Sequence, residues 1–336
     1  MELGERAYDI YVGSGILDMA GELFDLDRRI FILTDTGVPR EYSEAIKKCS
    51  KGAVIYTVPM GEGSKSLSTL EAVLSAMAEF KMSRSDALVA VGGGVVGDLG
   101  GFAAATYMRG IDFYGVPTTL LSEVDSSIGG KTAVNLGSIK NTVGAFHQPR
   151  GVLIDVKTLD TLDIRQIANG LAEAIKMAAT SDEALFEKIE REGFTKENRE
   201  DIITMALKIK KAVVEEDEKE TGLRKILNFG HTLGHGIEAE EELRGLYHGE
   251  CVALGMIPVI NGAERERLVS LCKKVGLPME HSYDLDKALS YVIHDKKVKG
   301  DTVSVVTVPK IGTHMIKKMT LREFENTVRE ALRKSI

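Results

Sequence analysis

The feature that most constrains the fold is a change of pattern between about residues 150 and 165. Before it, short runs rich in β-branched and aromatic residues alternate with amphipathic segments such as 67–80. Strands are predicted at 8–12, 29–34, 53–58, 87–91 and 112–116. Because strands that alternate with helices typically form parallel sheets, we predict an N-terminal, Rossmann-like α/β domain with a largely parallel sheet.

After the change of pattern, the helical period dominates. Helices are predicted at 167–179, 182–191, 196–215, 224–241 and 249–266, with one late strand at 302–308. A chain of 336 residues is also long for a single hydrophobic core. We therefore predict an α/β domain at 1–165 and a mainly α-helical domain at 166–336, with the active site in the cleft between them.

Composition argues against several classes of protein. The net charge of −7 leaves no basic excess to neutralise nucleic-acid phosphates. No apolar run reaches membrane-spanning length, and the first residues lack the apolar core of a signal peptide. The three cysteines are widely spaced and odd in number, which argues against a disulfide framework. We expect a cytoplasmic protein with no nucleic-acid or membrane partner.

A glycine-rich turn follows the predicted strand 87–91. Gly92, Gly94 and Gly97 have dinucleotide-binding spacing, in which backbone N–H groups approach a diphosphate at a helix N-terminus. The pattern is weak alone, since glycine turns between strands and helices are common. Other loops that follow predicted strands add groups suited to a nucleotide, namely Asp35, Glu62, Lys65, Thr118 and Thr119. Singly, each is more often a cap or a turn.

Three of the seven histidines fall within eighteen residues, at His231, His235 and His248. A helix would place His231 and His235 on one face, and neutral imidazole is both a metal ligand and a general base. Ordinary core packing is the alternative. Upstream, Glu173 and Lys176 share a helix face, either as a surface ion pair or as part of a site. One carboxylate and two histidines form an open zinc site, and the absence of an HExxH motif argues against a metalloprotease.

Cationic and amide side chains accompany these segments. Alone, each is more often solvated. Together they predict a pocket for a small polyanion, because arginine suits carboxylates and lysine suits phosphate. They are Arg109, Lys131, Lys140, Asn141, Lys210, Arg224 and Asn228.

The order and spacing of these motifs resemble the 3-dehydroquinate synthase family, in the sugar-phosphate cyclase group. The resemblance covers nearly the whole chain. Its motifs are GEGSKS at 61–66, GGGVVGD at 92–98, YMRG at 107–110, VPTTLL at 116–121, DSSIGGK at 125–131, KN at 140–141, DEKETGLR at 217–224, NFGHTLGH at 228–235 and HGE at 248–250.

The resemblance implies a role for each matching position. Glu173, His231 and His248 would bind one divalent metal, with zinc expected and cobalt as the alternative. The acid–base groups would be Glu220 and His235. NAD would be held by Asp35, Glu62, Lys65, Gly93, Gly94, Val95, Asp98, Thr118, Thr119, Lys140, Thr158, Leu159, Asp160 and Thr161. The substrate would contact Arg109, Asp125, Lys131, Asn141, Lys210, Arg224, Asn228 and Lys296, with Lys297 the alternative to Lys296.

The implied reaction converts 3-deoxy-D-arabino-heptulosonate 7-phosphate to 3-dehydroquinate and phosphate, in the shikimate pathway of aromatic amino acid biosynthesis. Hydride passes from C5 to NAD⁺, phosphate is eliminated, the hydride returns, and the opened ring closes by an intramolecular aldol step. The substrate phosphate can itself remove the C6 proton, so positioning would carry most of the catalysis. The resemblance also implies a homodimer.

Three other functions are compatible with parts of this pattern. Another cyclase of the group would act on glucose 6-phosphate or sedoheptulose 7-phosphate, which lack the carboxylate that Arg224 suits. An NAD- and metal-dependent polyol dehydrogenase would release NADH and would not need so many phosphate-binding cations. A non-catalytic metabolite-binding regulator would not need an intact set of metal and acid–base groups.

Overall fold

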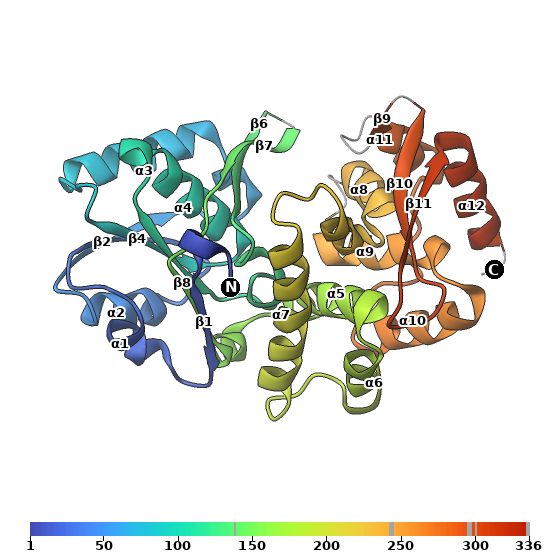
Figure 1. Ribbon diagram of the computed structural model, residues 1–336, viewed down its shortest axis with the longest axis horizontal. Helices are drawn as coiled ribbons and strands as arrows, with labels where there is room; N and C mark the ends of the chain where they lie inside the picture. The colour runs from blue at the N-terminus through green and yellow to red at the C-terminus, as the bar shows by residue number, and fades with distance from the viewer. Residues whose placement is uncertain (138, 242–244, 294–297, 300, 334–336) are drawn as a thin grey trace. The chain divides into compact units, whose positions relative to one another are not determined.

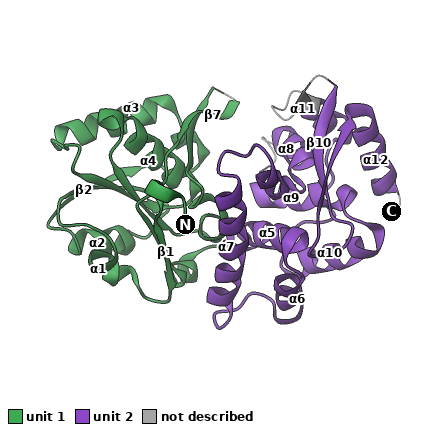
Figure 2. Ribbon diagram, viewed as in Figure 1, with its two compact units in different colours: residues 1–163 green, residues 164–336 purple. Residues whose placement is uncertain are grey.

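The computed structural model describes residues 1–137, 139–241, 245–293, 298–299 and 301–333. The chain divides into two units, residues 1–163 and 164–336 (Figure 2).

Unit 1 is built on a parallel sheet, as predicted. Its strands have the order β1-β8-β5-β4-β2-β3, and Figure 1 labels β1, β8, β4 and β2. They are β1 Asp9–Gly13, β2 Arg29–Asp35, β3 Gly52–Val58, β4 Ala87–Gly92, β5 Asp112–Pro117 and β8 Gly151–Asp155. All of the strands predicted in this unit are therefore present, within a residue or two. The prediction missed β8, which lies where the sequence pattern changes, and the antiparallel hairpin of β6 Lys131–Leu136 and β7 Ile139–Phe146.

Both faces of this sheet are buried, because alternate side chains of each strand enter different cores. Phe31 and Leu33 of β2 pack in one core with α3 and α4, whereas Ile30 and Ile32 pack in the other with α1 and α2. The helices of the unit are η1 Gly4–Arg6, η2 Leu17–Met19, α1 Ala20–Leu23, α2 Arg40–Lys48, η3 Glu62–Ser64, α3 Leu67–Glu79, α4 Gly94–Thr106, η4 Tyr107–Arg109, η5 Ser122–Ser126 and η6 Val156–Thr161.

Unit 2 is mainly helical, as predicted. Its helices are α5 Ile164–Ser181, α6 Glu183–Glu192, α7 Arg199–Glu216, η7 Leu223–Asn228, α8 His231–Glu240, α9 His248–Met256, η8 Ile257–Val259, α10 Gly262–Lys274, α11 Leu285–Ile293 and α12 Leu321–Arg333. Its strands, β9 Val298–Lys299, β10 Thr302–Thr307 and β11 Met315–Thr320, form an antiparallel sheet in the order β11-β10-β9. The sequence predicted only β10, since β11 is rich in lysine.

Two predicted helices are interrupted. The segment 224–241 was predicted as one helix, but Gly230 adopts a left-handed conformation (φ 77°) and separates η7 from α8. The segment 249–266 breaks after α9, where Pro258 lacks the N–H that a continuing helix requires. Among the described residues, no helix is long and apolar enough to cross a membrane.

Candidate functional site

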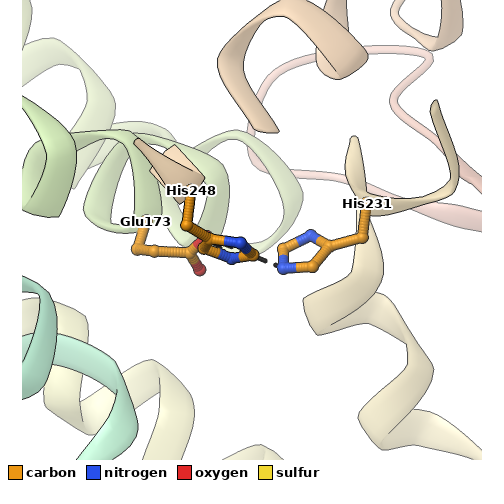
Figure 3. A group of neighbouring side chains, drawn as sticks. All are labelled: Glu173, His231 and His248. Carbon is orange, nitrogen blue, oxygen red and sulfur yellow. Dashed lines mark ion pairs between the residues drawn. The ribbon is translucent and has the colours of Figure 1, made fainter. Parts of the chain in front are cut away.

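Three helices of unit 2 bring the predicted metal ligands together. Glu173 lies on α5, His231 is the first residue of α8, and His248 is the first residue of α9. Oε1 of Glu173 lies 3.7 Å from Nε2 of His231 and 3.7 Å from Nε2 of His248. Both rings face the carboxylate (Figure 3). Residues that are 75 positions apart in the sequence thus form one cluster.

The cluster has the geometry and chemistry of a divalent-metal site. Glu173 is 1% exposed, and its Oε1 has no hydrogen-bond partner among the described residues. A distance of 3.7 Å is too long for a hydrogen bond. Zinc bonds of about 2.0–2.2 Å place tetrahedral ligand atoms about 3.3–3.6 Å apart, close to the observed spacing. A cation between these three atoms would satisfy the buried oxygen.

The other ring nitrogens of both histidines are held in place. Nδ1 of His231 lies 3.1 Å from the carbonyl oxygen of Phe229. Nδ1 of His248 lies 3.0 Å from Oε2 of Glu238. Such contacts fix the ring orientation and leave Nε2 available for a metal. Burial disfavours the protonated ring of His248, but the hydrogen bond and charge of Glu238 and the charge of Glu173 outweigh burial, so the pKa of His248 is raised. Protons therefore compete with a metal at this ring as the pH falls.

His235 lies one turn after His231 on α8, beside the cluster. Its ring centroid is 5.3 Å from that of His231 and 5.9 Å from that of His248. The predicted shared helix face is therefore confirmed. His235 is half-buried, whereas His231 is buried. A partly accessible imidazole next to the cluster is better suited to proton exchange with solvent or substrate than to a purely structural role.

Glycines allow the three ligand-bearing helices to approach this closely. A Cβ atom on Gly255 of α9 would overlap the carbonyl oxygen of Gly230 and lie 2.7 Å from the backbone nitrogen of Gly234 on α8. A Cβ atom on Gly249 would overlap the carbonyl oxygen of Asn169 on α5. The Asn169 side chain also accepts a hydrogen bond of 2.7 Å from the Gly249 backbone nitrogen. The contact of α9 with both neighbouring helices thus depends on the absence of side chains at these positions.

Replacing Gly255 by alanine is expected to push α8 and α9 apart. The free energy of unfolding should fall by roughly 1–3 kcal/mol, and metal binding should weaken because His231 and His248 separate. Denaturant unfolding and competition with a chelator measure the two effects. Gly262→Ala is the matched control, since a Cβ at Gly262 meets nothing within 4 Å. Equal metal affinity in the two variants would contradict this account of how the ligands are spaced.

Lys176 also belongs to the cluster, although no specific role was predicted for it. It forms an ion pair with Oε2 of Glu173, and both side chains are almost fully buried. The ion pair considered from the sequence is therefore present, but it is buried and does not lie on the surface. The apolar helix around Glu173 and Lys176 was the signal that a buried pair was present. Lys176 neutralises one carboxylate oxygen and leaves Oε1 to face the histidines.

The loop after α7 carries the predicted acid–base residue Glu220 and the predicted substrate residue Arg224. Glu220 has a left-handed backbone (φ 58°), and its Oε1 accepts a 2.5 Å hydrogen bond from the side-chain amide of Asn228. Arg224 is 3% exposed and lies in η7, which packs against α7, the helix that carries the buried Lys210. Of the predicted substrate residues in unit 2, Lys296 lies outside the described residues, as does Lys297.

Asp217 organises this loop and was not predicted as a functional residue. Its carboxylate accepts backbone hydrogen bonds from Thr221 (2.8 Å), Gly222 (2.6 Å) and Arg224 (3.0 Å). Desolvation of Asp217 opposes ionisation, but these donors together outweigh it and lower its pKa to about 2. The folded-state pKa lies below the ordinary value of 3.8. The contribution of Asp217 to loop order is therefore complete above about pH 4 and disappears as the pH falls through 2.

We expect Asp217→Asn to lower turnover by about 100-fold, because small displacements of catalytic groups have effects of that size. Metal content should not change, since no metal ligand lies in the loop. The ratio of wild-type to variant activity should stay constant from pH 5 to 9, where the Asp217 carboxylate stays ionised. Glu216→Gln, at the exposed preceding residue, is the control. A ratio that changes across this range would show that another group titrates.

In unit 1, the predicted nucleotide residues gather at strand ends. β2 and β4 are paired neighbours with Leu33 opposite Ala90, so Asp35 and Gly92 end adjacent strands. The chain leaves β2 toward β3 on one side, and leaves β4 toward β5 on the other. Ligands of parallel α/β sheets bind at such a reversal of strand order. Gly93 caps the N-terminus of α4, where backbone N–H groups suit a diphosphate.

Other predicted cofactor residues follow strands β3, β5 and β8 of the same sheet, or lie in α4 and β7. Lys65 forms a largely buried ion pair with Asp98 on α4, and Glu62 accepts a 2.8 Å hydrogen bond from Asn135. Thr118, the next residue after β5, is buried, and its backbone nitrogen bonds the Gly92 carbonyl at 3.0 Å. The remaining ones are Gly94 and Val95 in the first turn of α4, Thr119 after β5, Lys140 on exposed β7, and Thr158, Leu159, Asp160 and Thr161 in η6.

Two of the predicted substrate residues of unit 1 have strained backbones. Arg109 has φ 71°, next to Met108 at 48°, and Asn141 has φ 53°. Non-glycine residues adopt such angles at a cost of about 1–3 kcal/mol each, and they cluster at functional sites. Asp125 lies in η5 and Lys131 begins β6. A cavity in this unit with room for about 30 Å³ of water is lined by Gly93, Asp98, Ser126 and Lys131, among others.

Comparison with known proteins shows the family to which this chain belongs. The model of the N-terminal region of 3-dehydroquinate synthase matches residues 55–169, and the model of the C-terminal region matches residues 170–298. The 3-dehydroquinate synthase of Enterococcus faecalis is 43% identical over 342 residues, which covers 96% of this chain and 95% of the relative. The chain belongs to the 3-dehydroquinate synthase family. The resemblance inferred from the motifs is confirmed.

Solved structures of related cyclases share the fold. A 2-deoxy-scyllo-inosose synthase complexed with carbaglucose-6-phosphate, NAD⁺ and Co²⁺ matches with a TM-score of 0.87 and 28% identity, over 96% of both chains. The 2-epi-5-epi-valiolone synthase of Streptomyces hygroscopicus subsp. jinggangensis, with NAD⁺ and Zn²⁺ bound, matches with a TM-score of 0.86 and 27% identity, over 99% of both chains. The predicted fold, a Rossmann-like unit with a helical C-terminal part, is thereby also confirmed.

Proposed function

We propose that this chain converts 3-deoxy-D-arabino-heptulosonate 7-phosphate to 3-dehydroquinate and phosphate, as a metal- and NAD-dependent lyase. Membership of the 3-dehydroquinate synthase family supports this reaction over those of related cyclases. The single structural observation that carries the proposal is the buried Oε1 of Glu173, which has no hydrogen-bond partner in the described part of the chain and faces two imidazole nitrogens. When bound, a divalent cation there would polarise the substrate hydroxyl, and NAD⁺ would accept and return the hydride.

The residues of unit 2 have separate roles in binding the metal, in proton transfer and in binding the substrate. Glu173, His231 and His248 hold the cation, with zinc the expected metal and cobalt the alternative. His235 exchanges a proton with the substrate beside the cluster. Glu220, paired with Asn228, supplies a second acid–base group. Buried Arg224 suits the substrate carboxylate, which glucose 6-phosphate and sedoheptulose 7-phosphate lack.

The residues of unit 1 hold the cofactor. Asp35 suits the ribose hydroxyls at the end of β2, and the N-terminus of α4 suits the diphosphate. Lys65 is held by its ion pair with Asp98, and its ammonium group supplies a positive charge near the same strand ends. The related cyclases solved with NAD⁺ and Co²⁺ or Zn²⁺ support this cofactor pair. A homodimer and a cytoplasmic location stay predictions. Light scattering tests the first, and cell fractionation the second.

The test combines purified protein, NAD⁺ and zinc with the heptulosonate phosphate. We expect phosphate release with formation of 3-dehydroquinate, no net NADH, and loss of turnover when a chelator is added. Stoichiometric NADH would instead identify a polyol dehydrogenase. Turnover of glucose 6-phosphate or sedoheptulose 7-phosphate would identify another cyclase. Undetectable turnover with both NAD and zinc bound would favour a metabolite-binding regulator.

A further inference from the structure

A second group of ligand-bearing side chains adjoins the candidate metal centre. His235, Glu238 and His248 each place one ligand atom within 4.8 Å of those of the other two. His235 and Glu238 lie one turn apart on α8, and His248 begins α9. Two imidazoles and one carboxylate are the ligand set of open zinc sites. This group therefore has the donors that a divalent transition metal requires.

The two groups share His248, whose two ring nitrogens lie near the carboxylates of different groups. Its Nε2 lies 3.7 Å from Oε1 of Glu173, and its Nδ1 lies 3.0 Å from Oε2 of Glu238. The groups differ in burial, because Glu173 and His231 are buried, whereas His235, Glu238 and His248 are all half-buried. Water competes more strongly for ligands in the accessible group, and the attraction of a cation to its carboxylate is weaker there. The second group should therefore fill only after the first.

We propose that His235, Glu238 and His248 form a second, weaker divalent-metal site that stops turnover when metal is in excess. A cation there takes the lone pair of His235 that proton transfer requires. It also replaces the Nδ1 proton of His248, which passes to solvent, and it draws Glu238 away from orienting that ring. The inhibition rests on the proposed function, since it assigns the proton-handling role to His235. The binding of a second metal does not depend on that role.

Titration of the full-length protein with Co²⁺ alone, by equilibrium dialysis, tests the site. We expect two equivalents per chain, the second binding at least about tenfold more weakly, so that the two steps are distinct. Loss of turnover with Co²⁺ or Zn²⁺ should follow occupancy of the second step. The visible absorption of bound Co²⁺ provides a readout that is independent of activity.

Two variants separate the steps. Glu238→Gln should lose the weak equivalent and the inhibition by excess metal, while still binding the tight equivalent. Glu173→Gln should lose the tight equivalent and still bind one weak Co²⁺. His314→Gln is the control and should keep both steps, because His314 lies outside both groups and contacts the Thr180 carbonyl.

Each of the following outcomes would overturn either the second metal site or the metal centre of the proposed function. A single equivalent in the wild type at all Co²⁺ concentrations would overturn the second site and leave the proposed function intact. Loss of all Co²⁺ from Glu173→Gln, or inhibition that persists in Glu238→Gln, would likewise overturn it. No bound Co²⁺ in the wild type would instead overturn the metal centre of the proposed function.

Discussion

Replacing His231 by alanine is expected to remove the tightly bound metal and to lower turnover by at least about 1,000-fold, since metal catalysis supplies several kcal/mol. His231 contributes one of the two nitrogen atoms that face Oε1 of Glu173 at 3.7 Å. Without it, the remaining pair of ligands on α5 and α9 cannot hold a cation against water. Metal analysis after dialysis measures the first effect, and release of phosphate from the substrate measures the second.

His235→Ala is the matched comparison, because His235 lies on the same helix and its ring is 5.3 Å from that of His231. This variant should retain one tightly bound metal per chain and still turn over more slowly, since it loses a proton-handling group. Full metal content in the His231 variant, or an empty site in the His235 variant, would reverse the division of roles. Circular dichroism should confirm that both variants remain folded.

The second large effect is expected from Lys176→Met. Breaking a buried ion pair leaves the other charge uncompensated, which lowers the free energy of unfolding by about 3–5 kcal/mol. The chain length of methionine nearly preserves the packing, so the effect isolates the charge. We expect this loss in the presence of a chelator and a smaller loss with zinc, because a cation at Oε1 also compensates the Glu173 carboxylate.

Denaturant unfolding of both variant and wild type, with and without zinc, measures that difference. Lys211→Met is the control, because Lys211 forms a 2.8 Å ion pair with Glu215 on α7 but is 39% exposed. Removing such a surface pair should change the free energy of unfolding by no more than about 1 kcal/mol. Equal effects of Lys176→Met with and without zinc would mean that no cation binds beside Glu173.

Much of the fold could be predicted from local pattern. Residues 30–33 of β2 send alternate side chains into two different cores, and such a strand reads as a continuous apolar run. The secondary-structure predictions failed where single residues or short segments depart from the surrounding pattern. The left-handed Gly230 divides a segment that has helical periodicity, and β11 carries two adjacent lysines in an exposed strand. β8 was missed because it lies where the alternation of strands and helices changes to a helical pattern.

The sequence by itself determined which residue types were available and, through motif order, the family. His231 and His235 share a helix face because a step of four residues is only slightly more than one helical turn. Only the tertiary structure brought Glu173 and His248 to the ring of His231, because that approach depends on backbone contacts at Gly249 and Gly255 between separate helices. The same is true of Glu238, which meets His248 on another helix, whereas Lys176 and Glu173 pair through their i,i+3 spacing and only their burial depends on helix packing. Local periodicity carries no information about which helix faces meet, and the metal site is formed where they do.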